Sequence, residues 1–309
     1  IFQDHDSARF GQTDLQLKLK LKKQTLIIPS SKTFTLKKDQ SVILPFNLSM
    51  EGALLKYSTT QLLAKVEEKN AVHYFFFAPE GLRTEYSFDK STLSSGKEFY
   101  TPKPGLKSTF SITVKNGKTL KITTLTRQQA LNTTKVNNHI LITEATVLPE
   151  KEQCTLLSLG KTQISYALYT ANKGWKEETI EVQPVDVKAD WKKVGTRRMT
   201  VKIDQPDVPQ VNDYFLRVNY VADVAMAFIG GYLVLDHYYY GIPWTIGLRR
   251  FKNELKNEYL SFYFRPLRKD APFIGDLPVE AIPDFSQKDA DCLVRSVDVI
   301  PEYKAIVNI

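Results

Sequence analysis

Alternation of apolar and polar residues dominates the chain. From Leu15 to Lys22 the leucines fall on one set of alternate positions and lysines fill most of the other. Successive side chains of a β-strand point to opposite faces, so this pattern predicts a strand with one solvent-facing side. Short apolar runs predict further strands at Thr25–Ile28, Ser41–Leu44, Leu54–Tyr57, Ala71–Ala78, Glu85–Phe88, Ile140–Val147, Gln163–Tyr169, Thr179–Val182, Tyr214–Tyr220, Val224–Ile229, Tyr232–Asp236 and Leu260–Phe264. Strands at this spacing, without helical periodicity between them, predict an all-β fold of the sandwich or barrel type.

Glycines between the runs predict hairpins. The runs Phe110–Val114 and Leu120–Leu125 flank an Asn116-Gly117 pair, which favours a type I′ turn because that turn needs positive φ at both central residues. Gly230-Gly231 predicts a second hairpin. A phosphate-binding loop is not expected there, because no helix follows and the Gly-Lys-Ser/Thr pattern is missing.

The length of 309 residues predicts two domains, since single domains typically hold roughly 100–200 residues. We place the boundary at Leu148–Glu152, where a β run ends in a proline and a charged cluster, giving domains 1–149 and 150–309. Asp204–Asn212 is expected to be a loop of the second domain, and Pro266–Pro283 an ordered wrap between strands. Alternating βα units are missing, so no catalytic (β/α)₈ barrel is predicted.

Charge and composition narrow the possible partners. The net charge is +8, yet residues 1–150 hold 21 Lys+Arg against 13 Asp+Glu whereas residues 151–309 hold 21 against 21. Much of the excess alternates with apolar residues, which favours solvated strand faces over a nucleic-acid partner. No apolar run approaches the roughly 20 residues of a membrane span. Cys154 and Cys292 are compatible with one disulfide or with two buried thiols.

Two stretches resemble domains that follow the catalytic barrel in family-35 β-galactosidases. The first contains Leu26-Ile27-Ile28-Pro29, Leu54–Thr60 and a run ending in Pro79-Glu80-Gly81, and it is similar to the first β domain after the barrel. The second runs from Tyr214 to Leu248 and includes Asp236-His237-Tyr238 and Gly241-Ile242-Pro243-Trp244-Thr245-Ile246-Gly247-Leu248. It resembles the galactose-binding-like jelly-roll module of the bacterial members. The resemblance therefore implies two β-sandwich or jelly-roll-type domains, the second galactose-binding-like.

This resemblance implies an accessory, non-catalytic role in β-galactoside degradation, with a catalytic (β/α)₈ barrel of the same polypeptide as the partner. The family's catalytic glutamates lie on barrel strands, and no residue here matches those motifs. The pairs Glu67-Glu68 and Glu177-Glu178 do not replace them, because neighbours on a strand point to opposite faces. The parent enzyme is expected to be bacterial and secreted, periplasmic or at the cell surface. Any leader is expected to lie outside this chain.

The segment Asp236–Trp244 is the best candidate for a functional surface. Its aromatic rings, carboxylate and imidazole are groups that bind sugars, so Asp236, His237, Tyr239 and Trp244 are candidate ligands of galactose-containing glycans. Core packing is the favoured alternative, followed by contact with a catalytic barrel, because Tyr and Trp more often close a sandwich core. An independent carbohydrate-binding module is therefore the alternative function, and a surface adhesion protein is a third.

No cofactor or metal is expected. Asp284, Asp289 and Asp291 lack the glycine and bidentate glutamate of an EF-hand loop, so a solvated loop is favoured over a calcium site. The four histidines, at 5, 73, 139 and 237, have no ligand spacing and form no Ser-His-Asp pattern.

Overall fold

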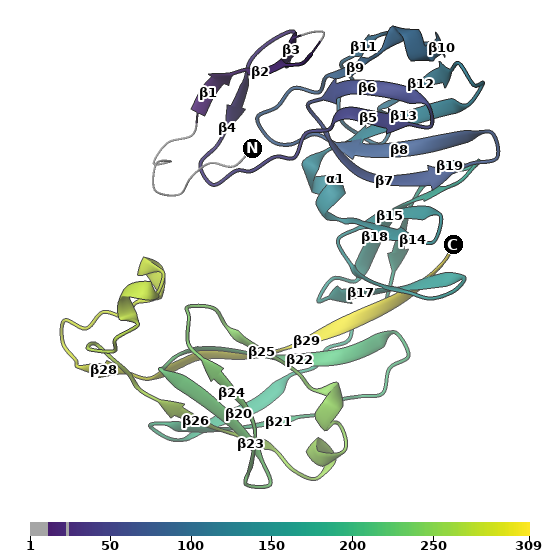
Figure 1. The fold of residues 1–309 in the computed structure, drawn as a ribbon. Helices are drawn as coiled ribbons and strands as arrows, with labels where there is room; N and C mark the ends of the chain where they lie inside the picture. Colours follow the sequence, from purple (N-terminus) through teal and green to yellow (C-terminus); the bar gives the residue numbers. More distant parts are fainter. Residues whose placement is uncertain (1–11, 23–24) are drawn as a thin grey trace. The chain divides into compact units, whose positions relative to one another are not determined.

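The computed structural model describes residues 12–22 and 25–309, and β-strands make up most of them (Figure 1). Within these residues α1 (Arg127–Leu131) is the one α-helix, and the other helical segments are single 3₁₀ turns. The predicted all-β fold is confirmed. The chain forms two compact units, each assembled from separate segments. Unit 1 comprises the chain up to Glu144 together with Ser165–Thr179 and Ile309, and unit 2 comprises Ala145–Ile164 and Ile180–Asn308.

Unit 1 contains a β-sandwich of two sheets, with strand orders β10-β12-β13-β8-β7 and β11-β9-β6-β5. Their facing side chains form one core in which Leu55, Phe76, Tyr86 and Ile122 are fully buried. The strands are β5 (Phe46–Met50), β6 (Ala53–Ser58), β7 (Gln61–Glu67), β8 (Ala71–Phe77), β9 (Tyr86–Phe88), β10 (Leu93–Ser95), β11 (Phe99–Tyr100), β12 (Thr109–Val114) and β13 (Thr119–Leu125), with the 3₁₀ turn η1 (Lys90–Thr92) after β9.

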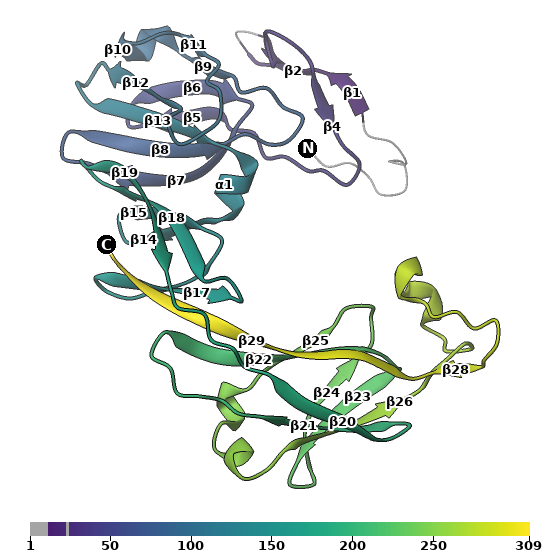
Figure 2. The same cartoon turned by 180° about the vertical axis from the view of Figure 1, so that it is seen from behind.

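Strand β8 is buried on both faces. It lies between β13, to which it runs parallel, and β7 (Figure 2). Val72, Tyr74 and Phe76 point into the sandwich core, while Phe75 packs into a second cluster with Ile140 of the next sheet. That sheet has the order β14-β15-β18-β19, formed by β14 (Thr133–Val136), β15 (His139–Thr143), β18 (Gln163–Thr170) and β19 (Gly174–Glu181). A strand covered on both sides needs apolar residues at consecutive positions, which explains the continuous run.

Four short strands precede the sandwich of unit 1 and form two two-stranded sheets. One pairs β1 (Gln12–Leu15) with β4 (Phe34–Leu36), and the other pairs β2 (Leu17–Lys20) with β3 (Thr25–Ile28). Lys18 and Lys20 are exposed, and the alternating leucines are half-buried. The lysines thus form a solvated strand face. A small cluster around Phe34, Leu36, Val42 and Leu82 joins this segment to the rest of the unit.

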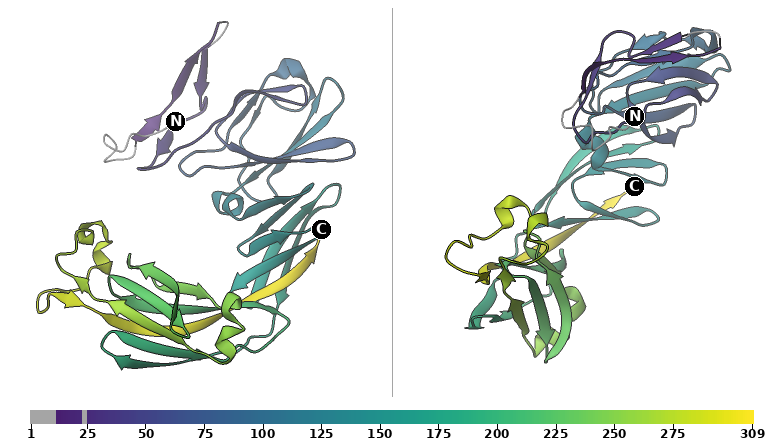
Figure 3. Two further views of the ribbon diagram at one scale, coloured as in Figure 1. Left: turned by 60° about the horizontal axis from the view of Figure 1, so that its bottom comes forward. Right: turned by 60° about the vertical axis from the view of Figure 1, so that its left-hand side comes forward.

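Unit 2 is a sandwich of two five-stranded sheets, with orders β16-β17-β29-β22-β25 and β20-β21-β26-β23-β24 (Figures 1 and 3). Leu216, Ile246 and Val297 of the first sheet share one core with Met199 and Phe262 of the second. The strands are β16 (Thr146–Pro149), β17 (Gln153–Leu159), β20 (Ala189–Gly195), β21 (Arg198–Ile203), β22 (Val211–Val221), β23 (Val224–Ile229), β24 (Tyr232–Tyr238), β25 (Trp244–Gly247), β26 (Leu260–Arg265) and β29 (Leu293–Asn308). The remaining elements are β27 (Leu267–Arg268), β28 (Ala290–Asp291) and the turns η2 (Arg249–Phe251), η3 (Glu254–Lys256), η4 (Ile274–Asp276) and η5 (Val279–Ala281).

Both predicted hairpins form, but one uses a different turn. Gly230 and Gly231 have φ values of 56° and 84°, which is the backbone that a type I′ turn requires. The type I′ prediction for Asn116-Gly117 is wrong, because only Gly117 has a positive φ, of 85°. That hairpin closes with the Gly117 N–H donating to the Val114 carbonyl at 2.9 Å. The Asn116 side chain instead accepts a hydrogen bond from the Lys118 N–H at 3.0 Å.

Two predicted strands differ from those observed. Ser41–Leu44 has the predicted alternation but forms no ladder. There the Ile43 N–H is 3.3 Å from the side-chain oxygen of Gln61 rather than from a neighbouring strand. The run Ile140–Val147 is split between β15 and β16. Periodicity shows which residues are buried, but ladder formation also needs a partner strand.

Candidate functional site

The segment Asp236–Trp244 connects the two sheets of unit 2. Asp236 and His237 lie on β24, which is an edge strand of one sheet, and Trp244 begins β25, which is an edge strand of the other. The His237 and Trp244 rings stack with centroids 5.4 Å apart and an interplanar angle of 10°. The segment therefore closes one side of the sandwich, with aromatic rings spanning the two layers.

Two of the four predicted ligands belong to the core of unit 2. Tyr239 is 5% exposed and Trp244 is 6% exposed. The Tyr239 hydroxyl donates to the Ala281 carbonyl at 2.9 Å, and the Trp244 ring meets the edge of Phe262 at 5.8 Å. A side chain this deeply packed offers little ring face to a sugar. Their role in glycan binding stays a prediction, and their packing role is directly visible.

His237 is held by a second buried tyrosine. Its Nδ1 atom lies 2.7 Å from the Tyr220 hydroxyl, which is itself 3.1 Å from the His237 carbonyl oxygen. Burial lowers the pKa of His237, and the opposing effect of Asp236 is smaller. The imidazole is therefore neutral at neutral pH, so one ring nitrogen can accept a hydrogen bond. Both Tyr220 contacts are satisfied when its O–H donates to the His237 carbonyl oxygen and the Nδ1–H of the imidazole donates to the Tyr220 hydroxyl oxygen.

The exposed part of the segment consists of different residues. Asp236 is exposed, Tyr238 and Tyr240 are 69% and 51% exposed, and Ile242 is 51% exposed. These side chains present two aromatic rings and a carboxylate to solvent. A sugar contacting this surface would therefore meet Tyr238 and Tyr240 rather than Tyr239 and Trp244. The sequence alone could not distinguish the two pairs because both the strand end and the following loop are rich in tyrosine.

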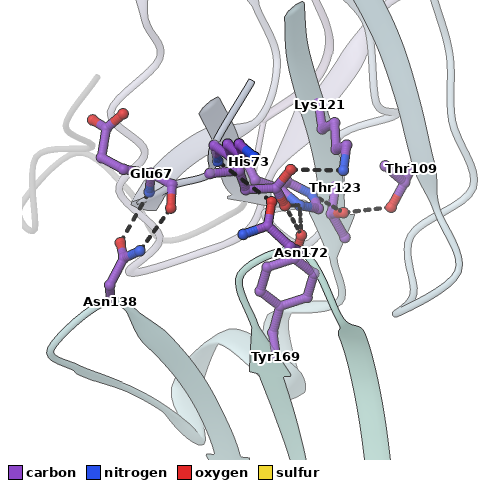
Figure 4. Close-up of polar contacts among 10 residues, drawn as sticks. Glu67, His73, Thr109, Lys121, Thr123, Asn138, Tyr169 and Asn172 are labelled. Carbon is purple, nitrogen blue, oxygen red and sulfur yellow. Dashed lines mark hydrogen bonds and ion pairs between the residues drawn. The ribbon is translucent and has the colours of Figure 1, made fainter. Parts of the chain in front are cut away.

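Unit 1 contains a buried polar network that sequence reasoning missed (Figure 4). His73 of β8 lies with Nδ1 2.6 Å from the Tyr169 hydroxyl and Nε2 2.7 Å from the Thr123 hydroxyl. Tyr169 in turn donates to Glu68, and Lys121 donates to the other Glu68 carboxylate oxygen at 2.7 Å. The network runs from the β12–β13 pair across β8 to β18. Its members come from β8, β12, β13 and β18 and from the turn that follows β7.

The donors and acceptors fix one arrangement of protons. Tyr169 uses its single proton for Glu68, so it accepts from His73, whose Nδ1 must carry hydrogen. Nε2 of His73 then accepts from the Thr123 hydroxyl, which accepts in turn from Thr109 at 2.5 Å. Every step has a donor facing an acceptor, which is what a buried polar group needs in order not to destabilise the fold.

Electrostatics agree with this arrangement. Burial lowers the pKa of His73 to about 4, despite the opposing effect of the Glu68 carboxylate. Burial by itself raises the pKa of Glu68, but hydrogen bonds from Lys121 and Tyr169 outweigh it, so the pKa lies below its usual value. Burial, reinforced by the hydrogen bond to Glu68, raises the pKa of Tyr169. His73 is thus neutral and Glu68 charged at neutral pH.

The packing around this network indicates that it stabilises the core and does not bind a substrate. His73 stacks on Phe75 with ring centroids 4.3 Å apart, and Tyr169 meets both rings edge-on. His73, Thr123 and Tyr169 are at most 4% exposed, so a substrate in solvent has no access to them. The sequence signal that could have found the network is a lone histidine inside the apolar run of β8.

The remaining acidic residues and cysteines considered in the sequence analysis do not form a site. Glu68 points inward while Glu67 is exposed and lies 2.9 Å from Lys65, as expected for neighbours on opposite faces. Asp284 accepts from the Ser286 N–H at 2.8 Å, and Asp289 and Asp291 pair with Lys269 and Lys288. Within residues 12–22 and 25–309 no group of three or more His, Cys, Asp or Glu side chains could hold a metal ion. Cys154 and Cys292 are free thiols.

Comparison with known proteins gives one family. The family described as beta-galactosidase, domain 2, matches residues 1–147, and no curated protein matches the sequence. None of the helices in the described part of the chain is long and apolar enough to cross a membrane. The described residues also contain no (β/α)₈ barrel, since they hold one short α-helix and no helices alternating with strands. Residues 1–147 are therefore similar to domain 2 of β-galactosidases, which supports a non-catalytic domain of the β-galactosidase type in this part of the chain.

Proposed function

We propose that this chain is the accessory, non-catalytic portion of a β-galactosidase-like glycoside hydrolase, supporting a (β/α)₈ catalytic barrel of the same polypeptide. The match of residues 1–147 to domain 2 of β-galactosidases is the observation that carries the proposal. A domain described as the second of its enzyme belongs to a multidomain polypeptide. A secreted, periplasmic or cell-surface location in a bacterium is part of the same proposal.

The second unit is proposed to be the galactose-binding-like jelly-roll module of that enzyme. Its support is the resemblance of Tyr214–Leu248, which here supplies strands β22 to β25 of a sandwich of two five-stranded sheets. Trp244 and Ile246, which belong to the motif that carries the resemblance, are buried in its core. They therefore specify packing first, which accords with a module whose main role is to support the enzyme.

Two observations test the main proposal. The purified chain should not hydrolyse nitrophenyl β-galactoside, because cleavage with retention requires two carboxyl groups held about 5–5.5 Å apart across the glycosidic bond. Turnover that is lost on changing one Glu or Asp would overturn a non-catalytic role. The coding frame upstream of Ile1 should encode a (β/α)₈ barrel. A frame that encodes no barrel would refute the accessory role in this polypeptide.

The exposed end of the aromatic segment favours a second candidate function, carbohydrate binding. Asp236 and Tyr238 point to the same side of β24, and Tyr240 follows in the adjoining loop, so this exposed end of the segment offers two aromatic rings and a hydrogen-bonding carboxylate. Aromatic faces and a few polar groups are the recurring elements of sugar sites. This surface differs from the residues first predicted, since Tyr239 and Trp244 lie inside.

Calorimetric titration with galactose and a panel of galactans tests this candidate. Tyr238→Ala and Tyr240→Ala should each weaken binding severalfold, because each removes one stacking face. Tyr232→Ala is the matched control, since Tyr232 lies at the other end of β24 and is 80% exposed. No heat at millimolar ligand, or an equal loss in all three variants, would refute a sugar site at this surface.

A further inference from the structure

A surface depression with a basic lining lies at one end of unit 2. It has a volume of about 460 Å³ and lies between the end of β21, the following loop and η3. Lys202, Lys252 and Lys256 supply its ammonium groups, while Ile203 and Leu255 supply apolar surface. The depression thus combines an apolar lining with flexible cationic side chains.

A second hollow of about 190 Å³ continues the depression. Gln205 and Lys252 line both hollows, so Lys252 stands where the two meet. Arg249 and Lys304 line the far part. The two hollows together are lined by five basic side chains and three carboxylates. A ligand that contacts the basic side chains of both hollows must carry several negative charges.

Most carboxylates of this surface are already engaged. Asp213 accepts from the Tyr214 and Arg249 N–H groups, each at 2.7 Å. Asp207 lies 3.3 Å from Lys252. Lys202, Lys256, Lys304 and Arg249 have no ion-pair partner within residues 12–22 and 25–309, against two lining carboxylates without one there, Asp204 and Asp213. The depression keeps an excess of unpaired positive charge.

This excess is local. Residues 151–309 hold 21 basic and 21 acidic residues, so the positive depression is not a consequence of the net charge of that half. Charges of one sign gathered in a concave surface raise the local concentration of oppositely charged ligands. We infer that the depression binds an acidic polysaccharide through its carboxylate or sulfate groups. The choice of a glycan rests on the proposed function.

The side chains that line the two hollows favour an acidic polysaccharide over a neutral sugar or a single-stranded nucleic acid. Neutral sugars and single-stranded nucleic acids are both bound largely by stacking on aromatic faces. Tyr214 is the one aromatic residue in the lining of the two hollows, and it is 5% exposed with its hydroxyl donating to the Pro206 carbonyl at 2.8 Å. No ring face is offered to a base or a neutral sugar, so charge is the means of recognition that remains.

Calorimetry on the whole chain tests the inference, using polygalacturonate and chondroitin sulfate at low ionic strength. The Lys202→Gln/Lys256→Gln double variant should bind about tenfold more weakly, at roughly threefold per exposed ion pair lost. Lys192→Gln/Lys193→Gln is the matched control, because it removes the same charge from exposed positions of β20 in the same unit. It should retain the parental affinity. Binding should weaken as salt is added.

Several outcomes would overturn the inference. These are no binding at low salt, an equal loss in both double variants, or equal affinity for an oligonucleotide of matched charge. Sodium sulfate and sodium galacturonate distinguish a polymer site from a free-anion site, and either one bound as tightly as the polymers would also overturn it. The accessory proposal is tested separately by nitrophenyl β-galactoside turnover and the upstream frame. The Tyr238 surface is tested by neutral galactan, which should bind both lysine double variants equally.

Discussion

Single buried polar residues define much of unit 1. Glu85 is 2% exposed, and its carboxylate accepts from Tyr57 and from both the backbone and side chains of Ser30 and Ser31. Burial alone raises the pKa of Glu85, but these hydrogen bonds outweigh it and hold the pKa below its usual value. The charged carboxylate therefore joins the Ser30-Ser31 loop to the sandwich.

Replacing Glu85 with Gln should destabilise unit 1 by about 2–4 kcal/mol. The change removes the charge and turns one acceptor oxygen into an N–H donor that faces other donors. Glu80→Gln is the control, because Glu80 is exposed and pairs with the exposed Lys37, and its loss of stability should be much smaller because solvent screens such a pair. Urea denaturation monitored by circular dichroism measures both. Equal losses would contradict the role given to Glu85.

Unit 1 should lose stability as the pH falls from 6.5 to 4. The folded pKa of His73 is about 4, below its unfolded value of about 6.5, so between these values the unfolded chain binds the extra proton. The contribution of His73 to the free energy of unfolding is therefore fully present above pH 6.5. On the order of 3 kcal/mol of it is lost by pH 4. Glu68, Lys121 and Tyr169 surround the imidazole.

A difference measurement isolates His73 in that pH range. Burial also lowers the pKa values of His139 and His237, which contribute a slope of the same sign. The free energy of unfolding of the parent and of His73→Gln should therefore be compared between pH 4.5 and 7. The variant should be less stable at pH 7, with the difference narrowing as the pH falls. A constant difference would show that His73 titrates normally.

At the scale of elements, alternation and turn residues predicted most strands but not their partners. The runs at Thr25–Ile28 and Val224–Ile229 coincide with β3 and β23. Ser41–Leu44 has the same alternation but forms no strand, because pairing depends on residues far away in the chain. The 16-residue β29 was not predicted, since Pro301 interrupts its apolar pattern. The sequence also could not separate the buried from the exposed aromatic residues of Asp236–Trp244.

The Pro79-Glu80-Gly81 turn requires glycine at its third position. Gly81 has a φ of 79°, and a Cβ atom there would lie 2.5 Å from the Thr35 carbonyl oxygen. Gly81→Ala should therefore combine backbone strain with a steric clash and cost about 2–4 kcal/mol. Gly117→Ala is the control, with a φ of 85° and nothing within 4 Å, and should cost about 1 kcal/mol. Thermal unfolding of the two variants measures the difference, and equal shifts would exclude the clash.

At the scale of the molecule, the chain enters each compact unit more than once. Residues 165–179 return to unit 1 after the two strands β16 and β17 of unit 2. The family match ends at residue 147, before the return. The returning segment supplies Ala167 and Tyr169 to the cluster around Phe75 and closes the hydrogen bonds of His73. The family match therefore ends before the residues that complete the core of unit 1.

A fragment of residues 1–147 should consequently be less stable than unit 1 in the whole chain. Without Tyr169, the buried Glu68 and His73 each lose a hydrogen-bond partner, and one face of Phe75 and Ile140 becomes exposed. Leaving such groups unsatisfied costs roughly 1–3 kcal/mol each, before the lost apolar contacts are counted.

We expect the fragment to bind a hydrophobic dye and to unfold at a lower urea concentration than unit 1 does in the whole chain. Tyr169→Phe in the whole chain separates the two contributions, because it removes the hydroxyl and keeps the ring. A fragment as stable as unit 1 of the whole chain would show that residues 1–147 complete their own core.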